Sequence, residues 1–247
     1  MERIALVSDI HGNYPAWQAV LADIDGKGIT RIFCLGDLVG KGPDAVKITD
    51  EVALRCEVII RGNWEELVAR MSENDELFGW QARQLGAERV KFLDELPFRH
   101  EFLLSGRLVS LVHASPENVF HRVQPWDDLE RRMGMFAPIV NPDTQESLIP
   151  DIVGYGDIHN AYMQHLEGRL LFNTGSVGNP LDMPAASYAI LEGDYLSEVI
   201  SPYSLQLVRV PYDIEQAVQD ARDADIPALD YYIKELRTGV YRAMQQD

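Results

Sequence analysis

Short apolar runs alternate with amphipathic stretches along the first sixty residues of the chain. Residues 3–8, 31–35 and 57–60 are compact apolar runs of the kind that forms buried strands. Between them, residues 14–27 and 43–55 carry apolar side chains at helical spacing. Strands that alternate with helices in this way predict a parallel sheet.

Two later stretches interrupt this regular pattern. Residues 64–95 keep a helical spacing of apolar side chains, with Gly79 and Gly86 as expected breaks, and predict an inserted helical cap. Residues 116–150 are rich in Pro and Asp and predict loop and short helix over one edge of the fold. We expect both stretches to shape a substrate pocket. Because neither contains a recognisable motif, they do not indicate which substrate the pocket binds.

Strand signals return on either side of the second insertion. Residues 98–104 and 107–112 form a hairpin pattern around Ser105 and Gly106, and further apolar runs predict a second sheet. These runs are residues 151–155, 162–166, 169–172, 187–191 and 204–210, and amphipathic helices over 214–224 and 228–244 close the chain. Because no linker or internal repeat divides the sequence, we expect one α/β domain over residues 1–247.

The composition adds limits on the class of protein. Hydrophobic residues make up 46% and charged residues 25% of the chain, which is typical of a globular domain. No apolar run approaches the 18 residues of a membrane span, and the first ten residues lack the features of a signal peptide. Cys34 and Cys56 are too few for a disulfide framework. These features predict a cytoplasmic protein.

The net charge of the chain limits which partners it can bind. The chain has 22 Lys and Arg against 39 Asp and Glu, a formal net charge of −17. Nucleic-acid polymers and anionic membranes would be repelled unless bound metal ions reversed the charge locally. A small anionic substrate held through metal is compatible with this charge.

Metal-binding side chains follow the predicted strands. In an open parallel sheet, ligands bind at the carboxyl ends of the strands, so residues from distant loops should meet there. Asp, Asn and His without thiolates favour manganese, iron or zinc over a structural zinc site. Two such ions can polarise a phosphoryl oxygen and activate water. The side chains in question are Asp9 and His11, Asp37, Asn63, His113, and Asp157 with His159.

These motifs, in this order, resemble the calcineurin-like metallophosphoesterase superfamily. The order is D-x-H, G-D-x-x-x-x-G-P, G-N-x-E, a strand-end His and G-x-x-H, and it extends from Asp9 to His159. The run N-T-G-S-V-G-N-P at residues 173–180 is similar to a turn of the small bacterial phosphodiesterase branch. Together with the element pattern, the resemblance implies an α-β-β-α sandwich of two mixed sheets with a helical cap insertion.

The resemblance also implies a site with two divalent or mixed-valence ions. One ion would be held by Asp9, His11, Asp37 and His159, and the other by Asp37, Asn63 and His113. Asp157 stands where the family has a further histidine ligand, and its oxygen donor favours manganese or iron, with zinc possible. Asp37, Asn63 and His113 are the expected catalytic set: a hydroxide bridging the ions would attack phosphorus while Asn63 aligns the substrate.

Position 64 departs from the family pattern. Most members have a histidine here that acts as a general acid, whereas this chain has Trp64, which cannot supply a proton. The change favours leaving groups that are stable as anions. In having Trp at this position, the chain is similar to a subgroup of the family that includes diadenosine-tetraphosphate hydrolases. Trp64 is either a stacking surface for a base or a core aromatic under the cap. Lys41 either contacts a substrate phosphate or is a solvated turn lysine.

Two alternatives to the dinucleoside polyphosphate hydrolase remain open. A nucleotide phosphodiesterase or phosphomonoesterase would use the same ligands on another small phosphorylated substrate. A non-catalytic scaffold for protein binding would explain the changes at positions 64 and 157, although a scaffold would be expected to lose several of the other ligands. Glu65 is expected to begin a helix and support the site, and Arg122 is expected to be a surface or packing residue.

Overall fold

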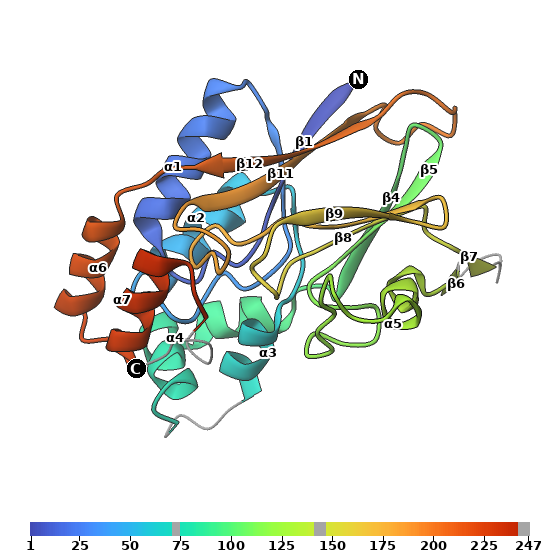
Figure 1. Ribbon diagram of the computed structural model, residues 1–247. Helices are drawn as coiled ribbons and strands as arrows, with labels where there is room; N and C mark the ends of the chain where they lie inside the picture. The colour runs from blue at the N-terminus through green and yellow to red at the C-terminus, as the bar shows by residue number, and fades with distance from the viewer. Residues whose placement is uncertain (71–74, 141–146, 242–247) are drawn as a thin grey trace.

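The computed structural model describes residues 1–70, 75–140 and 147–241, and its centre is two five-stranded mixed sheets. The first sheet has the order β12-β11-β1-β2-β3, in which the three N-terminal strands are parallel and β11 runs antiparallel to β1 and β12. Its strands are β1 Glu2–Val7, β2 Arg31–Cys34, β3 Val58–Ile59, β11 Ala186–Gly193 and β12 Ser204–Val210. The sheets and the helices that cover them are seen in Figure 1.

The second sheet has the order β4-β5-β8-β10-β9. β5, β8 and β10 are parallel to one another, and hairpin partners β4 and β9 flank them. The strands are β4 Arg99–Leu104, β5 Arg107–Val112, β8 Ile152–Tyr155, β9 Tyr162–Leu166 and β10 Arg169–Asn173. The predicted fold of two mixed sheets is confirmed. However, the runs near 187–191 and 204–210 return to the first sheet, because β11 pairs with β1.

Strand β1 shows how one sequence serves two cores. Ile4 and Leu6 pack between the sheets with residues of the second sheet such as Phe172. Ala5 and Val7, which alternate with them, pack toward the helices on the other face. Both faces of the strand are therefore buried, which explains why residues 3–8 form a continuous apolar run rather than an alternating one.

The outer face of the first sheet carries most of the helices (Figure 1). Helices α1 Tyr14–Gly26, α2 Ala45–Arg55 and α4 Phe78–Asp94 share a core with this face, α6 Ile214–Asp223 contacts α1, and α7 Leu229–Thr238 packs against α6. Asn13 caps α1 by accepting the Ala16 N–H, and proline occupies the first turn. None of the helices among the described residues has the length and hydropathy of a membrane span.

The outer face of the second sheet has a thinner cover. Helix α5 Leu129–Met133 and the 3-10 helix Gly134–Phe136 lie in the second insertion, and Met135 and Phe136 pack against Tyr155 and other residues of this sheet. A short pair of strands, β6 Ile139–Val140 and β7 Ser147–Leu148, belongs to the same insertion. Residues 141–146 of the predicted insertion lie outside the described residues.

The first insertion forms two helices, α3 Asn63–Arg70 and α4. Gly86 breaks α4 with φ 73°, as expected, whereas Gly79 lies within the first turn of α4 and breaks nothing. Leu85 and Leu93 of α4 pack in the helical layer of the first sheet. Residues 71–74 of this insertion, and residues 242–244 of the predicted final helix, lie outside the described residues.

Candidate functional site

The loops that follow the central strands meet at one edge of the two sheets. Loops after β1, β2, β5 and β8 carry the predicted ligands, and α3 begins with Asn63 after β3. Several of these residues have a left-handed backbone, which side chains other than Gly rarely adopt and which is found at functional sites. The positive φ values are 55° at Asp9, 49° at His11, 55° at Asp37, 61° at Asp157 and 61° at His159.

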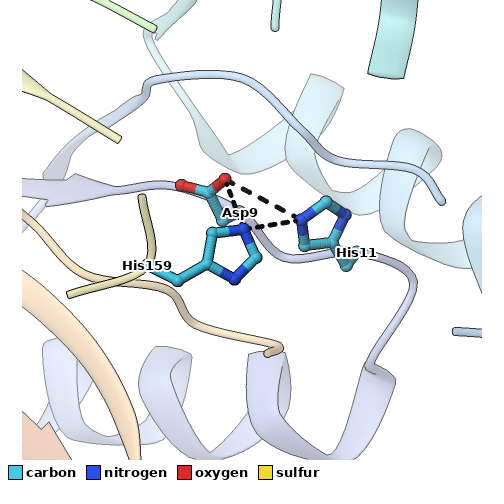
Figure 2. Close-up of side chains that lie close together, drawn as sticks. All are labelled: Asp9, His11 and His159. Atoms are coloured by element: carbon cyan, nitrogen blue, oxygen red, sulfur yellow. Dashed lines mark hydrogen bonds and ion pairs between the residues drawn. The ribbon is translucent and has the colours of Figure 1, made fainter. Parts of the chain in front are cut away.

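Asp9, His11 and His159 form the first buried cluster, shown in Figure 2. Asp9 Oδ1 lies 3.1 Å from His159 Nε2 and 3.8 Å from His11 Nε2. The two Nε2 atoms lie 3.1 Å apart. The three side chains therefore present two imidazole nitrogens and one carboxylate oxygen to a common point.

Asp9, Asp37 and His113 form the second cluster. Asp37 Oδ1 lies 3.4 Å from His113 Nε2, and Asp37 Oδ2 lies 3.6 Å from His11 Nε2. Asp9 belongs to both clusters, and Asp37 faces a histidine of each. The side-chain oxygen of Asn63 lies 2.9 Å from His113 Nε2, so Asn63 joins the second cluster.

Backbone carbonyl oxygens orient the three histidines. The Nδ1 atoms of His11, His113 and His159 lie 3.0, 2.7 and 2.5 Å from the carbonyl oxygens of Val39, Leu35 and Asn179. A carbonyl can only accept, so each Nδ1 carries a proton, and Nε2 is the ring nitrogen that faces the site. Histidine oriented in this way can bind metal through Nε2.

The clusters fit transition-metal ions. Asp9 Oδ1 is buried and has no hydrogen-bond partner among the described residues, although Nε2 of His159 and Nε2 of His11 lie 3.1 and 3.8 Å away. Burial disfavours the carboxylate of Asp9, but His159 and the other histidines outweigh it and hold its pKa below the ordinary value. Burial, together with Lys41, lowers the pKa of His11 and keeps it neutral. Burial disfavours the charged form of His113, but Asp37 outweighs it and raises the pKa of His113 well above its ordinary value. A carboxylate grouped with imidazoles is a donor set that a metal cation completes.

Glu65 connects the two loops that carry Asp37 and Asn63. Its buried carboxylate accepts the backbone N–H groups of Gly62, Asp37 and Leu38 at 2.7, 2.8 and 2.9 Å. Burial, reinforced by the nearby Asp37, raises the pKa of Glu65 to about 7. Glu65 therefore holds together the two loops that carry Asp37 and Asn63, which is the supporting role that the sequence led us to expect.

Asp157 is bound by an arginine. Arg122 donates from Nε and Nη2 to the two carboxylate oxygens, each at 2.8 Å, while the Asp157 N–H donates to Asp9 Oδ2 at 3.1 Å. Asp157 lies beside the metal-binding clusters but belongs to neither, so its role as a ligand stays a prediction. We expected Arg122 to be a surface or packing residue; its side chain is half exposed, but it also binds Asp157 and lines the cavity described below. Only its charge within a motif-free insertion could have drawn attention to it.

The comparisons with known proteins agree with this geometry. A family model for the calcineurin-like phosphoesterase superfamily domain matches residues 2–195. The chain belongs to the calcineurin-like phosphoesterase superfamily.

Similar proteins align with most of the length of this phosphoesterase. The uncharacterized protein MJ0912 from Methanocaldococcus jannaschii is 31% identical over 250 residues, which cover 87% of this chain and 90% of that protein. Phosphodiesterase YfcE from Escherichia coli is 26% identical over 211 residues, which cover 81% and 92%. A solved metallophosphoesterase from Sphaerobacter thermophilus aligns with a TM-score of 0.75 at 25% identity and covers 97% of this chain and 99% of its own. Membership in this family supports the assignment of the protein as a hydrolase.

The turn that resembles the small bacterial branch lies against the loop of Asp9. Ser176 Oγ and the Gly178 N–H both donate to the Asp9 carbonyl oxygen, at 2.7 and 3.0 Å. A Cβ at Gly178 would lie 1.7 Å from the Ile10 carbonyl oxygen, so only glycine permits this approach. The next residue, Asn179, supplies the carbonyl that orients His159.

A cavity of about 380 Å³ opens beside the clusters of the phosphoesterase. Its polar lining residues include several of the predicted site residues together with Arg122. Its other lining residues are apolar or aromatic. The polar lining includes Asp37, Lys41, Asn63, Arg122, Asp157 and His159, and the remainder includes Trp64, Leu77, Trp126, Leu181, Pro227, Tyr232 and Tyr241.

Trp64 and Lys41 both line this cavity. The ring of Trp64 meets His11 edge to face at 5.6 Å, lies 5.1 Å from the ring of Phe78, and packs on Gly40. Trp64 is thus partly a packing residue and partly a wall of the cavity. Lys41 is not a solvated turn lysine: its side chain is 10% exposed and donates to Asn179.

Proposed function

We propose that this phosphoesterase hydrolyses a phosphoanhydride or phosphoester bond of a nucleotide with two transition-metal ions. The observation that carries the proposal is the pair of clusters that share Asp9, with Asp37 between His11 and His113. Our preferred substrate is a dinucleoside polyphosphate of the diadenosine tetraphosphate type. Manganese or iron is the preferred metal and zinc is possible.

The residues divide the work as follows. Asp9, His11 and His159 would hold one ion, and Asp9, Asp37, Asn63 and His113 the other. When bound, the two ions would polarise a phosphoryl oxygen and activate a water. The carbonyl partners of the three histidines keep each Nε2 directed at the centre of the site.

Arg122 supplies positive charge on the cavity side of the site. Its guanidinium group uses two of its five N–H groups on Asp157, and its side chain is 50% exposed. The other N–H groups can donate to phosphate oxygens that point into the cavity. Because Asp157 fixes the guanidinium by two bonds, Arg122 would orient the phosphate as well as attract it.

Trp64 supports an anhydride as the substrate. Its indole lines the cavity at the position of the family acid and cannot protonate a leaving group. A phosphate leaves an anhydride as a stable anion, whereas an alkoxide needs a proton. The position therefore favours dinucleoside polyphosphates over phosphoserine proteins.

A nucleotide phosphodiesterase is the second candidate, favoured by the relative that is named a phosphodiesterase. A protein-binding scaffold is disfavoured by the intact His and Asp clusters. We further propose a cytoplasmic enzyme, since both cysteines are free thiols, and one that acts on no nucleic-acid polymer or membrane, since its net charge is −17.

The test is metal analysis followed by a substrate panel. The purified protein should bind about two ions per chain, since the clusters offer more ligands than one tetrahedral ion takes. Diadenosine tetraphosphate, cyclic nucleotides, phosphomonoesters and an aryl phosphodiester are then assayed with manganese, iron and zinc separately. We expect turnover of the anhydride, and its loss in Asp37→Asn and His113→Ala but not in the surface variant Asp25→Asn. No bound metal and no activity with any added ion would refute the hydrolase.

A further inference from the structure

The apolar part of the cavity has a distinct origin. We call Trp126, Tyr232 and Tyr241 the aromatic wall. Tyr232 belongs to α7 and Tyr241 follows that helix, so both lie outside residues 2–195, the stretch that the family model matches. Trp126 lies in the second insertion. The aromatic wall therefore combines one residue from within the matched stretch with two from beyond it.

The aromatic wall is held in place relative to the clusters. Glu235 of α7 is fully buried, and its Oε2 lies 3.5 Å from Lys41 Nζ, on the loop that follows Asp37. Trp80 of α4 packs on the cluster that contains Tyr232, and Figure 1 shows α7 next to α4. Ala228, which caps α7 and also lines the cavity, keeps a left-handed backbone at φ 59°. Such a backbone persists in a non-glycine residue only where its surroundings impose it.

The members of the aromatic wall leave interactions unmade. Trp126 is 72% exposed and Tyr241 is 39% exposed, although aromatic rings of this size are usually well buried. Tyr232 is 2% exposed, and its phenol oxygen is buried with no hydrogen-bond partner among the described residues. Burial raises the pKa of Tyr232, so the phenol stays neutral. The wall thus offers apolar ring faces together with one buried polar group.

A planar heterocycle matches this combination. Ring faces stack on heterocycles, and a base carries polar edge groups that a phenol can hydrogen-bond. Arg122 and His159 line the same cavity as the aromatic wall, and Tyr241 of the wall is an electrostatic neighbour of Arg122. The volume of about 380 Å³ falls within the range of small-ligand sites. We infer that the aromatic wall binds the base of a nucleotide whose phosphate lies at the Arg122 side of the cavity.

This inference rests on the proposed function only in taking the ligand to be a nucleotide, and equilibrium binding tests it without hydrolysis. AMP and ribose 5-phosphate share a phosphate and a sugar and differ in the base. Their affinities for the full chain with manganese are measured by titration calorimetry. We expect AMP to bind about tenfold tighter or more. The ratio should approach one in Trp126→Ala and in Tyr241→Ala.

Phe120→Ala is the matched control, because Phe120 is an exposed aromatic of the same insertion that does not line the cavity. Its ratio should equal that of the wild type. A wild-type ratio near one, a ratio unchanged in both wall variants, or an equal loss in Phe120→Ala would each overturn the subsite. Hydrolysis of diadenosine tetraphosphate together with a ratio of one would refute the subsite and leave the proposed function standing. A tenfold ratio without hydrolysis under any metal would leave only the subsite.

Discussion

At the scale of single residues, the site depends on which atom of each side chain is already engaged. Each of the three site histidines uses Nδ1 to donate a hydrogen bond to a backbone carbonyl oxygen, and this leaves Nε2 facing the centre of the site. Asp9 leaves Oδ1 without a hydrogen bond, whereas both oxygens of Asp157 are taken by Arg122. This difference explains why Asp9 joins two clusters and Asp157, although adjacent, joins none.

Glu65 gives a prediction on stability. Glu65→Gln turns an amide N–H₂ toward backbone N–H groups that the carboxylate now accepts, and leaves at least one unpaired. The free energy of unfolding should fall by about 1–3 kcal/mol, the typical cost of a buried unpaired donor. Urea unfolding measures it. Glu66→Gln is the control, since Glu66 makes ion pairs with Arg70 and Arg61 but accepts none of the backbone N–H groups that Glu65 accepts, and it should lose less. Equal losses of unfolding free energy in the two variants would show that the backbone contacts of Glu65 do not contribute more to stability than an ordinary ion pair does.

Trp64 gives a prediction on leaving groups. Because Trp64 supplies no proton, rates should fall steeply as the pKa of the leaving group rises across a series of aryl and alkyl esters. Trp64→His should raise turnover of alkyl phosphates, by up to about 100-fold, more than that of anhydrides, since general acid catalysis helps only poor leaving groups. Steady-state rates on both proteins decide it. A wild-type rate independent of leaving-group pKa would contradict the argument.

At the scale of elements, loops rather than strands carry the chemistry, and close backbone contacts hold them together. The turn over residues 173–180 lies on the Asp9 loop through Ser176 and Gly178, and it orients His159 through Asn179. The loop after β2 is tied to α3 by Glu65. The sheets supply the common edge, and these contacts set the final positions of the ligands.

Gly178→Ala tests the first of these contacts. The new Cβ would meet the Ile10 carbonyl oxygen at 1.7 Å and push the turn away from the Asp9 loop. We expect the free energy of unfolding to fall by about 1–3 kcal/mol and manganese affinity to weaken as well. Denaturant unfolding and metal titration measure the two effects. Gly26→Ala, whose Cβ would meet nothing within 4 Å, should keep both near wild type. Wild-type behaviour of Gly178→Ala would refute the role of this contact.

At the scale of the whole molecule, an excess of negative charge surrounds a site built to bind cations. The net charge of −17 and the two acidic clusters both favour cation binding, but for different reasons. Screening of the overall charge depends on ionic strength alone, whereas the clusters require a metal that accepts imidazole nitrogen.

Metal addition separates these two contributions. Manganese at about 100 times its Kd should stabilise the protein by about 2.7 kcal/mol per site, seen as a rise in Tm. Potassium chloride at the same ionic strength should give a much smaller rise. Asp9→Asn should abolish the manganese effect, since Asp9 belongs to both clusters. An equal rise with potassium chloride would attribute the stabilisation to charge screening.

The sequence by itself determined the order of strands and helices in the N-terminal half and the residues that follow each strand. It could do so because apolar runs, turn glycines and ligand types are local patterns, and because parallel strands must end at a common edge. The meeting of Asp9, His11 and Asp37 follows from that rule, whereas His113 comes from the second sheet and joins them only because the two sheets pack together. The family resemblance is carried by the same local patterns.

Only the tertiary structure decided which residues complete the cavity. Arg122 reaches Asp157, Lys41 meets Glu235, and Tyr232 lines the cavity beside them, although each joins segments far apart in the chain. The return of β11 to the first sheet is of the same kind. No periodicity or spacing encodes such contacts, because they depend on how the layers pack rather than on the residues next to each other in sequence.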